Sequence, residues 1–219
     1  PASLKCFLTS ALVGLTAAIA LHQESANASP YGTWLSKPQI MFHLSNGTLG
    51  PALQRMRAQQ YRVVFLDFRH VSDLDQQKVA QVARQSQLMP ITWIQSPQFR
   101  SLSVQQLMDE GRHTDGIQVD DHYFTHYSRS DFYALRSQYR KQIFCSIQPF
   151  QAAIVPPTGC NQFDVQCYSP VKFKQCMGLA DRLRAVPSLS TQNTLGYRNL
   201  MGERSFNVFL WPHTDEFVN

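Results

Sequence analysis

The chain has 219 residues, of which 43% are hydrophobic and 11% aromatic, and its formal net charge at pH 7 is +5. This composition is typical of a folded domain and excludes a disordered or fibrous chain. The positive charge comes from single Lys and Arg residues scattered along the sequence, so no nucleic-acid partner is implied. We expect a monomer.

Residues 1–28 have the features of a secretory signal peptide. A lysine precedes the apolar run 6–21, and the small residues Ala26 and Ala28 follow it, two positions apart. The run contains Gly14 and Thr16, and it is shorter than the roughly 20 apolar residues of a membrane-spanning helix. We predict cleavage after Ala28 and an exported, periplasmic or extracellular protein without stable membrane insertion. A retained membrane anchor is the alternative.

The segment 29–219 contains four cysteines, Cys145, Cys160, Cys167 and Cys176. In an exported chain, two disulfides are possible, one is favoured, and free buried thiols are the alternative. Zinc binding is disfavoured, because no two of these cysteines have C-x-x-C spacing and two of them lie in apolar, strand-like runs.

Apolar runs of strand length recur along this segment, and most are separated by polar segments with helical spacing. Helices are predicted at 49–60, through Val79 and Val82 with Asp73 or Asp75 as the cap, at 103–111, and at 172–186. The predicted strands, in chain order, are 39–44, 62–68, 88–94, 116–121, 142–147, 163–168, 194–198 and 206–211.

This pattern predicts an α/β fold, a compact (β/α)8 TIM-type barrel in a single domain, residues 29–219. Strands that are covered on both faces are nearly continuous in hydrophobicity, and a set of eight favours a closed barrel over an open sheet. No glycine-rich phosphate loop follows any strand, so no cofactor is expected. The chain is short for such a barrel, so some helices must be short or replaced by loops, as in 151–162.

Such barrels carry their functional residues at the carboxyl ends of the strands. There the sequence supplies aromatic rings, which stack on sugar C–H surfaces, and polar groups, which bind sugar hydroxyls. Tyr123, Phe124 and Tyr127 could form a stacking platform, and the alternative is a hydrophobic lid under the fourth loop. The candidate ligand-binding residues are His43, Trp93, Gln95, His122, Tyr123, Gln148, Tyr168, Tyr197 and Trp211, and the candidate acids are Asp67, Asp120 and Asp121.

The fourth predicted strand is the most informative. Its alternation places Ile117 and Val119 toward the helices, and Gln118 and Asp120 toward the barrel axis.

Two adjacent aspartates at the end of an apolar strand are costly to desolvate. They must therefore be hydrogen-bonded, exposed to a cleft or partly protonated, and a raised pKa would suit an acid catalyst. The alternative is that Asp121 caps the loop and Asp120 pairs with a cation such as Arg69.

Residues 115–124, D-G-I-Q-V-D-D-H-Y-F, resemble the D-G-[IV]-H-[FL]-D-D-Y-x-[YF] signature of bacterial glycosyl-hydrolase-like barrels, exported proteins of the glycosidase superfamily. Gln118 stands at the usual His and His122 at the usual Tyr. Tyr168, after the sixth strand, and Trp34, within Y-G-T-W-L, are similar to further motifs of that family. The resemblance implies a barrel that acts on a polysaccharide or a glycan of the cell envelope.

A glycosidase normally needs two carboxyl groups, about 5–5.5 Å apart for retention and about 6.5–9.5 Å apart for inversion of configuration. We expect Asp120 to act as acid or base, Asp121 to support it and Asp67 to be its partner, while Glu203 and Asp215 lie in nearby loops. The seventh predicted strand lacks the glutamate that many barrel glycosidases carry. A catalytically silent, glycan-binding barrel is therefore the alternative.

A metal-dependent phosphodiesterase is a third hypothesis, built on His43, His70, Asp67 and Asp120. No H-x-H spacing supports it, so we expect no metal. A serine nucleophile is not indicated, because the sequence has no G-x-S-x-G motif.

Overall fold

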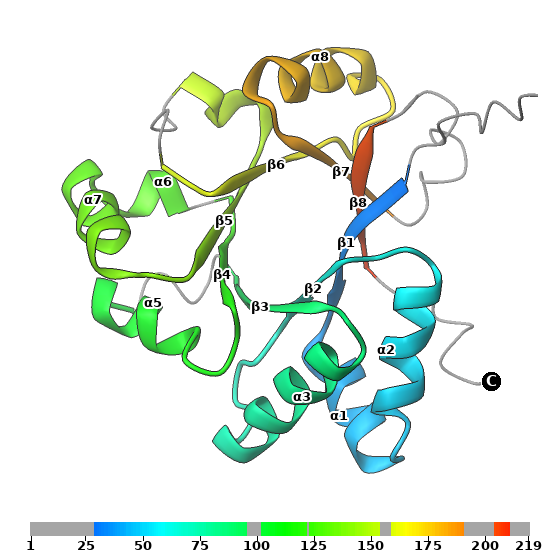
Figure 1. The fold of residues 1–219 in the computed structure, drawn as a ribbon. Helices are drawn as coiled ribbons and strands as arrows, with labels where there is room; N and C mark the ends of the chain where they lie inside the picture. The colour runs from blue at the N-terminus through cyan, green and yellow to red at the C-terminus, as the bar shows by residue number, and fades with distance from the viewer. Residues whose placement is uncertain (1–28, 96–101, 122, 154–158, 191–203, 211–219) are drawn as a thin grey trace, which may run out of the picture.

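The computed structural model describes residues 29–95, 102–121, 123–153, 159–190 and 204–210. Eight parallel strands form a closed barrel in which each strand pairs with the next and β8 pairs with β1 (Figure 1). The strands are β1 Ser29–Leu35, β2 Val63–Leu66, β3 Met89–Ile94, β4 Gly116–Val119, β5 Gln142–Ile147, β6 Gln162–Gln166, β7 Val186–Ser190 and β8 Ser205–Phe209. The predicted single-domain (β/α)8 fold is confirmed.

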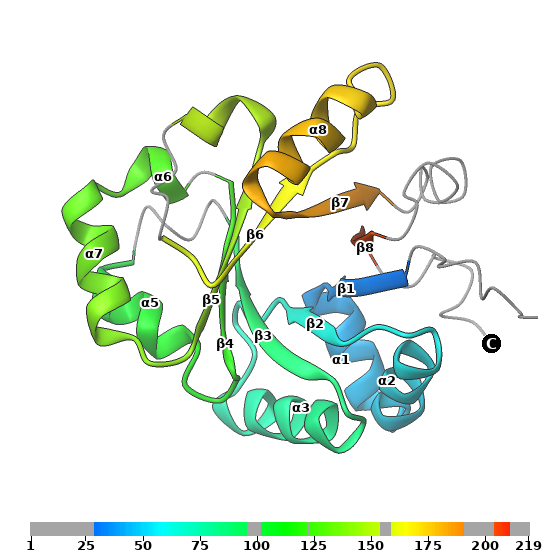
Figure 2. The same ribbon diagram turned by 45° about the horizontal axis from the view of Figure 1, so that its top comes forward.

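The helices lie outside the barrel, as both ribbon views show (Figure 1, Figure 2). They are α1 Lys37–Ser45, α2 Leu49–Ala58, α3 Asp73–Gln85, α5 Val104–Glu110, α6 Tyr123–His126, α7 Arg129–Gln138 and α8 Phe173–Leu183, and a 3-10 turn, η1, spans Pro149–Ala153. One apolar core lies between the strands and α1, α2, α3 and α8, and a second lies under α5 and α7. In the described ranges, no helix has the length and hydropathy needed to cross a bilayer.

The prediction of a first strand at 39–44 is wrong, because this run forms most of helix α1. Ser36 begins the helix with extended backbone, its amide donates to Gln39 Oε1 at 2.7 Å, and Pro38 occupies the first turn, where its missing N–H costs nothing. The true first strand is Ser29–Leu35. Its Pro30 and Gly32 interrupt the apolar pattern, and the register shifts between them.

The seventh strand also differs from the prediction. The expected helix 172–186 ends at Leu183, because Arg184 adopts a left-handed conformation with φ 52°, and the chain returns as β7. Pro187 and the alternating residues that follow it gave only a weak strand signal, but pairing with both β6 and β8 makes this segment a strand. The predicted strand 194–198 lies outside the described residues.

Serine hydroxyl groups cap the first turns of two helices. Ser103 begins α5 as predicted, with its Oγ accepting from the Gln106 amide, and Gly111 follows the helix end. The cap of α3 is Ser72, whose Oγ accepts from the Asp75 amide, and neither predicted aspartate fills that role.

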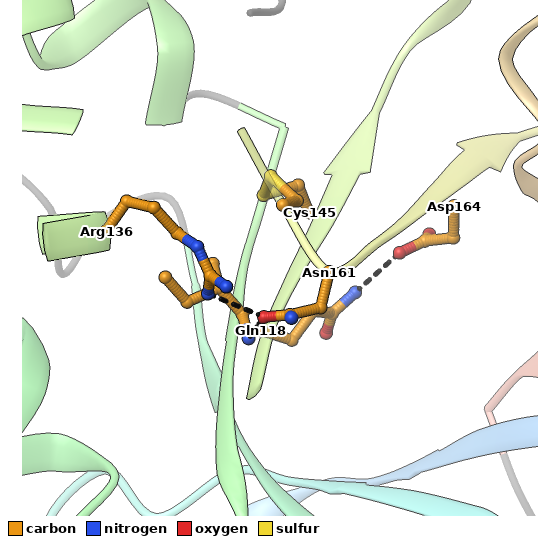
Figure 3. The surroundings of a disulfide bond; sticks show 7 residues. Gln118, Arg136, Cys145, Asn161 and Asp164 are labelled. Carbon is orange, nitrogen blue, oxygen red and sulfur yellow. Dashed lines mark hydrogen bonds between the residues drawn. A yellow bond between two sulfur atoms is a disulfide. The ribbon is translucent and has the colours of Figure 1, made fainter. Parts of the chain in front are cut away.

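Two disulfides form, where the sequence favoured one. Cys145 of β5 pairs with Cys160, just before β6, and Cys167, just after β6, pairs with Cys176 of α8. Figure 3 shows the first of these bonds beside Asn161, whose Oδ1 accepts from the Ile143 amide and from Arg136. Both disulfides therefore tie β6 to its surroundings.

Gly116 provides a test of strand packing. A Cβ at this position would lie 2.2 Å from the backbone oxygen of Gln142, so Gly116→Ala must displace β4 from β5. We expect the substitution to lower the free energy of unfolding in urea by about 1–3 kcal/mol. The control is Gly178→Ala in α8, where the nearest atom is an Arg182 nitrogen at 3.8 Å. There, helix propensity should raise stability by about 0.5–1 kcal/mol. Equal effects at the two sites would contradict the packing argument.

Candidate functional site

The barrel interior has an apolar half and a polar half. Strand register places neighbouring inward side chains on one surface, as with Trp93, Gln118 and Phe144 of β3, β4 and β5. The apolar half holds Trp34, Val63, Phe65, Ile91, Trp93 and Phe144. The polar half holds Gln118, Ser146, Asp164, Gln166, Ser188 and Asn207, which come from β4 to β8.

A cavity of about 210 Å³ opens where the two halves meet, at the carboxyl ends of the strands. Its lining residues are Trp34, Trp93, Gln118, Asp120, Asp121, Ser146, Gln166, Tyr168 and Phe209. Two carboxylates, three neutral polar side chains and four aromatic rings therefore face one small space.

The aromatic rings group around Phe209. The ring centroids of Trp34, Trp93 and Tyr168 lie 5.4, 5.6 and 6.0 Å from that of Phe209. Burial, and then the nearby aspartates, raise the pKa of Tyr168, so its phenol stays neutral at physiological pH. Trp34 is fixed by its indole N–H, which donates to Gln118 Oε1 at 2.8 Å.

The two adjacent aspartates have different environments. The carboxylate of Asp121 accepts from Gln148 Nε2, its backbone oxygen accepts from Gln151 Nε2, and the residue is 6% exposed. Asp120 is partly exposed to the cavity, and its Oδ1 accepts from the Asp121 amide at 3.0 Å and from Gln166 Nε2 at 3.5 Å. Asp120 is thus the more accessible acid.

Asp67 lies at the end of β2 and is only 1% exposed. Both of its carboxylate oxygens accept from Arg69, at 2.9 and 2.8 Å, and Oδ2 also accepts from Gln95 Nε2 at 3.0 Å. The hydrogen bond between Arg69 and Asp67 raises the pKa of Arg69. Asp67 does not line the cavity described above, so its proposed partnership with Asp120 stays a prediction. Arg69, the cation suggested for Asp120, is bound by Asp67 instead.

Asp164 is a carboxylate that sequence reasoning did not assign to the site. It points into the barrel from β6, is 2% exposed and lies beside the cavity residues Gln118 and Ser146, to which it is hydrogen-bonded. It accepts from Gln118 Nε2 at 3.2 Å, Ser146 Oγ at 2.8 Å and Ser188 Oγ at 2.9 Å, and Figure 3 shows the bond from Gln118. Burial, together with the charge of Asp120, raises the pKa of Asp164 to about 7, although the three hydrogen bonds oppose this shift.

Several predicted residues meet at this end of the barrel. Trp93 and Tyr168 line the cavity, and the alternation predicted for β4 is confirmed, because Gln118 bonds across the interior while Ile117 and Val119 pack under the helices. Gln148 and Gln95 hold Asp121 and Asp67 respectively.

Two predicted ligand-binding residues lie elsewhere. His43 belongs to α1 and not to a strand end; it is buried, with Nδ1 2.9 Å from Thr48 Oγ1, and burial lowers its pKa. Tyr123 is fully buried among Phe124, Tyr127 and Phe132, so it belongs to a hydrophobic layer and not to a stacking platform. The predicted residues that lie outside the described part of the chain are His122, Tyr197, Glu203, Trp211 and Asp215.

Six residues of the site were not predicted from the sequence as site residues: Trp34, Gln118, Ser146, Asp164, Gln166 and Phe209. Most could have been found by applying period-two alternation to β5, β6 and β8 as it was applied to β4. Trp34 could be assigned to the site only if β1 were recognised as a strand. Among the described residues, no group of three or more His, Cys, Asp or Glu side chains is arranged to hold a metal ion.

No family model matches this chain, and no curated protein matches it in sequence. Solved structures match its fold. The GH113 β-mannanase AaManA from Alicyclobacillus acidocaldarius, in complex with ManMIm, has a TM-score of 0.60 and 8% identity over 85% of this chain and 87% of that one. The tryptophan synthase complex from Pyrococcus furiosus has a TM-score of 0.57 and 13% identity, over 84% of this chain and 87% of that one. A variant of the citrate synthase SbnG has a TM-score of 0.55 and 13% identity, over 87% of this chain and 89% of that one. These similarities show a shared TIM-barrel fold, in proteins that include a glycosidase and synthases.

The Asp67–Arg69 pair provides a test of what holds this end of β2. Asp67→Asn removes the charge that binds a two-thirds-buried Arg69 and should lower the free energy of unfolding by roughly 2 kcal/mol. The matched control is Asp181→Asn, which breaks the exposed pair with Arg204 and should cost less than about 1 kcal/mol. Chemical denaturation of both variants measures the difference. Equal losses would show that burial does not strengthen the Asp67 pair.

Proposed function

We propose that this chain is a glycoside hydrolase that cleaves a polysaccharide by carboxylate acid–base catalysis. The observation that carries the proposal is the cavity in which Asp120 and Asp121 face the rings of Trp34, Trp93 and Tyr168. Aromatic faces suit the C–H surfaces of sugar rings, amides and hydroxyls suit their hydroxyl groups, and a carboxyl group can transfer a proton to or from a glycosidic oxygen or a water.

In this proposal Asp120 is the acid or base, because it is the more accessible carboxylate and is oriented by Gln166. Asp121 supports it from a position fixed by Gln148 and Gln151. Gln118 and Ser146 face the same cavity and are placed to bind sugar hydroxyls.

Two similarities bear on the proposal, and only the first supports a sugar substrate. Residues 115–124 resemble the signature of glycosyl-hydrolase-like barrels, and the fold is similar to that of a GH113 β-mannanase. The second similarity supports the fold only, since synthases share it. β-Mannan, the substrate class named for that β-mannanase, is included in the substrate panel as one of several glycans.

We also propose that the protein is exported. The signal-like segment 1–28 supports this, and so do the two disulfides, since such bonds persist mainly in oxidising compartments. An envelope or extracellular glycan would then be available as substrate.

A glycan-binding barrel without turnover is the second candidate. One observation favours it: Asp121 accepts a hydrogen bond from Gln148, and Asp67 pairs with Arg69, so both candidate partners of Asp120 already bind other side chains. Such a protein would bind the same sugars without cleaving them.

Asp120→Asn tests the catalytic role. The amide keeps the shape of the side chain but cannot donate or accept the reacting proton, so turnover should fall about 10²- to 10⁴-fold. Reducing-end assays on β-mannan, xylan, cellulose and peptidoglycan measure turnover, and calorimetry with soluble oligosaccharides measures binding. The control is Asp109→Asn, which removes an exposed carboxylate from α5 and should leave turnover unchanged.

Unchanged turnover in Asp120→Asn would refute the catalytic assignment. Binding without turnover in the wild-type protein would favour the glycan-binding candidate. If none of these glycans were bound or cleaved, the proposed function itself would be wrong for this panel.

A further inference from the structure

Asp164 is the least expected group inside the barrel. Its carboxyl group is nearly inaccessible to solvent, and a buried charge is costly unless a cation or several donors compensate for it. Among the described residues, no Lys, Arg or His contributes to the electrostatics of Asp164. The titratable groups that face it are Asp120, from the end of β4, and Tyr168, which follows β6; its partners on β4, β5 and β7 are neutral.

A hydrogen-bonded path connects Asp164 to Asp120. Ser146 Oγ donates to Asp164 Oδ2 at 2.8 Å and accepts from Gln166 Nε2 at 3.1 Å. The same Gln166 nitrogen is 3.5 Å from Asp120 Oδ1. Ser146, Gln166 and Asp120 all line the cavity, so the buried acid is two side chains away from the accessible one.

One buried polar atom near Asp164 lacks a hydrogen-bond partner within the described part of the chain. Asn207 Nδ2 donates to Ser188 Oγ at 3.3 Å, and the Ser188 hydroxyl donates to Asp164, which leaves the fully buried Asn207 Oδ1 without a partner in the described structure. A proton on Asp164 would bond to Ser188 Oγ.

We propose that Asp164 is a positioning residue: its carboxyl group, which holds a proton in the active form, accepts from Ser146 and so fixes Ser146 and Gln166 against Asp120. The proton keeps the interior neutral beside the negative charge of Asp120. When Asp164 loses this proton, two carboxylates repel each other across Ser146 and Gln166, and Asp120 holds its own proton more tightly. This inference deepens the proposed function, because it states how the charge of the catalytic candidate is set.

Carboxyl carbon NMR of the full chain across pH tests the proposal directly. One aspartate resonance, absent from Asp164→Asn, should titrate with a midpoint near the value of about 7 that burial produces. In Asp120→Asn this midpoint should shift to lower pH, because the neighbouring negative charge is gone. A midpoint below about 5, close to that of an ordinary aspartate, would overturn the proposal. So would a midpoint that Asp120→Asn leaves unchanged.

Ser146→Ala tests the path without removing Asp164, and it serves if Asp164→Asn fails to fold. Losing the serine donor removes a bond that favours the ionised form, so the Asp164 midpoint should move to higher pH. An unchanged or lower midpoint in Ser146→Ala would overturn the role assigned to Ser146.

Stability gives a second readout. Because the folded protein holds this proton more tightly than the unfolded chain does, wild-type stability should fall as pH rises from about 4 to about 7. Asp164→Asn, whose amide mimics the protonated acid, should lack this pH-dependent loss of stability. The difference between the two unfolding curves across that range is the measured quantity, and a difference independent of pH would overturn the proposal.

These measurements need no substrate, so they decide the role of Asp164 even if the proposed function fails. Where a glycan is cleaved, the wild-type rate should change across about pH 7, and Asp164→Asn should lack that step. Identical pH–rate profiles in the two proteins would overturn the coupling to Asp120 while leaving glycoside hydrolysis itself intact.

Discussion

The structure depends on satisfying polar groups inside a closed barrel. Eight paired strands leave no edge, and every second side chain must point into a space that holds little water. Asp164, Gln118, Ser146 and Ser188 occupy that space from four different strands, and they remain there because each bonds to another. These bonds join β4, β5, β6 and β7 across the interior, in addition to the backbone ladder, and they fix the direction of the polar groups beneath the cavity.

The apolar half of the interior complements this network. Trp34 belongs to both halves: its ring stacks on Phe65, with centroids 4.5 Å apart, and its N–H bonds to Gln118. Packing therefore orients the rings, and hydrogen bonds orient the amides and carboxylates. The cavity forms where these two kinds of surface meet, and this combination, more than the fold, leads to a sugar as the proposed ligand. TIM barrels serve many reactions, as the similarity to both a β-mannanase and synthases illustrates.

The residues of β4 show what a pattern in one strand can predict. Ile117 and Val119 were expected under the helices and Gln118 toward the axis, and the structure has them there, since alternation is a local property of an extended chain. Asp164 shows the limit of the same reasoning. Its strand could be recognised, but its importance comes from Ser146 and Ser188 on neighbouring strands and from Gln118 across the barrel, and no local pattern contains those contacts.

The sequence by itself determined the fold class and six of the eight strands, because strand-length apolar runs and helix-cap residues act over a few positions. It did not determine β1 and β7. Proline and glycine weaken the strand-like hydrophobic patterns of these two segments, and the apolar run after β1 forms helix α1. Only tertiary structure decided these two strands, because pairing with a neighbour on each side supplies hydrogen bonds that local preference does not. Tertiary structure also decided that Asp120 is partly exposed in the cavity and that Asp164 is buried beside it, since burial depends on residues far apart in the chain.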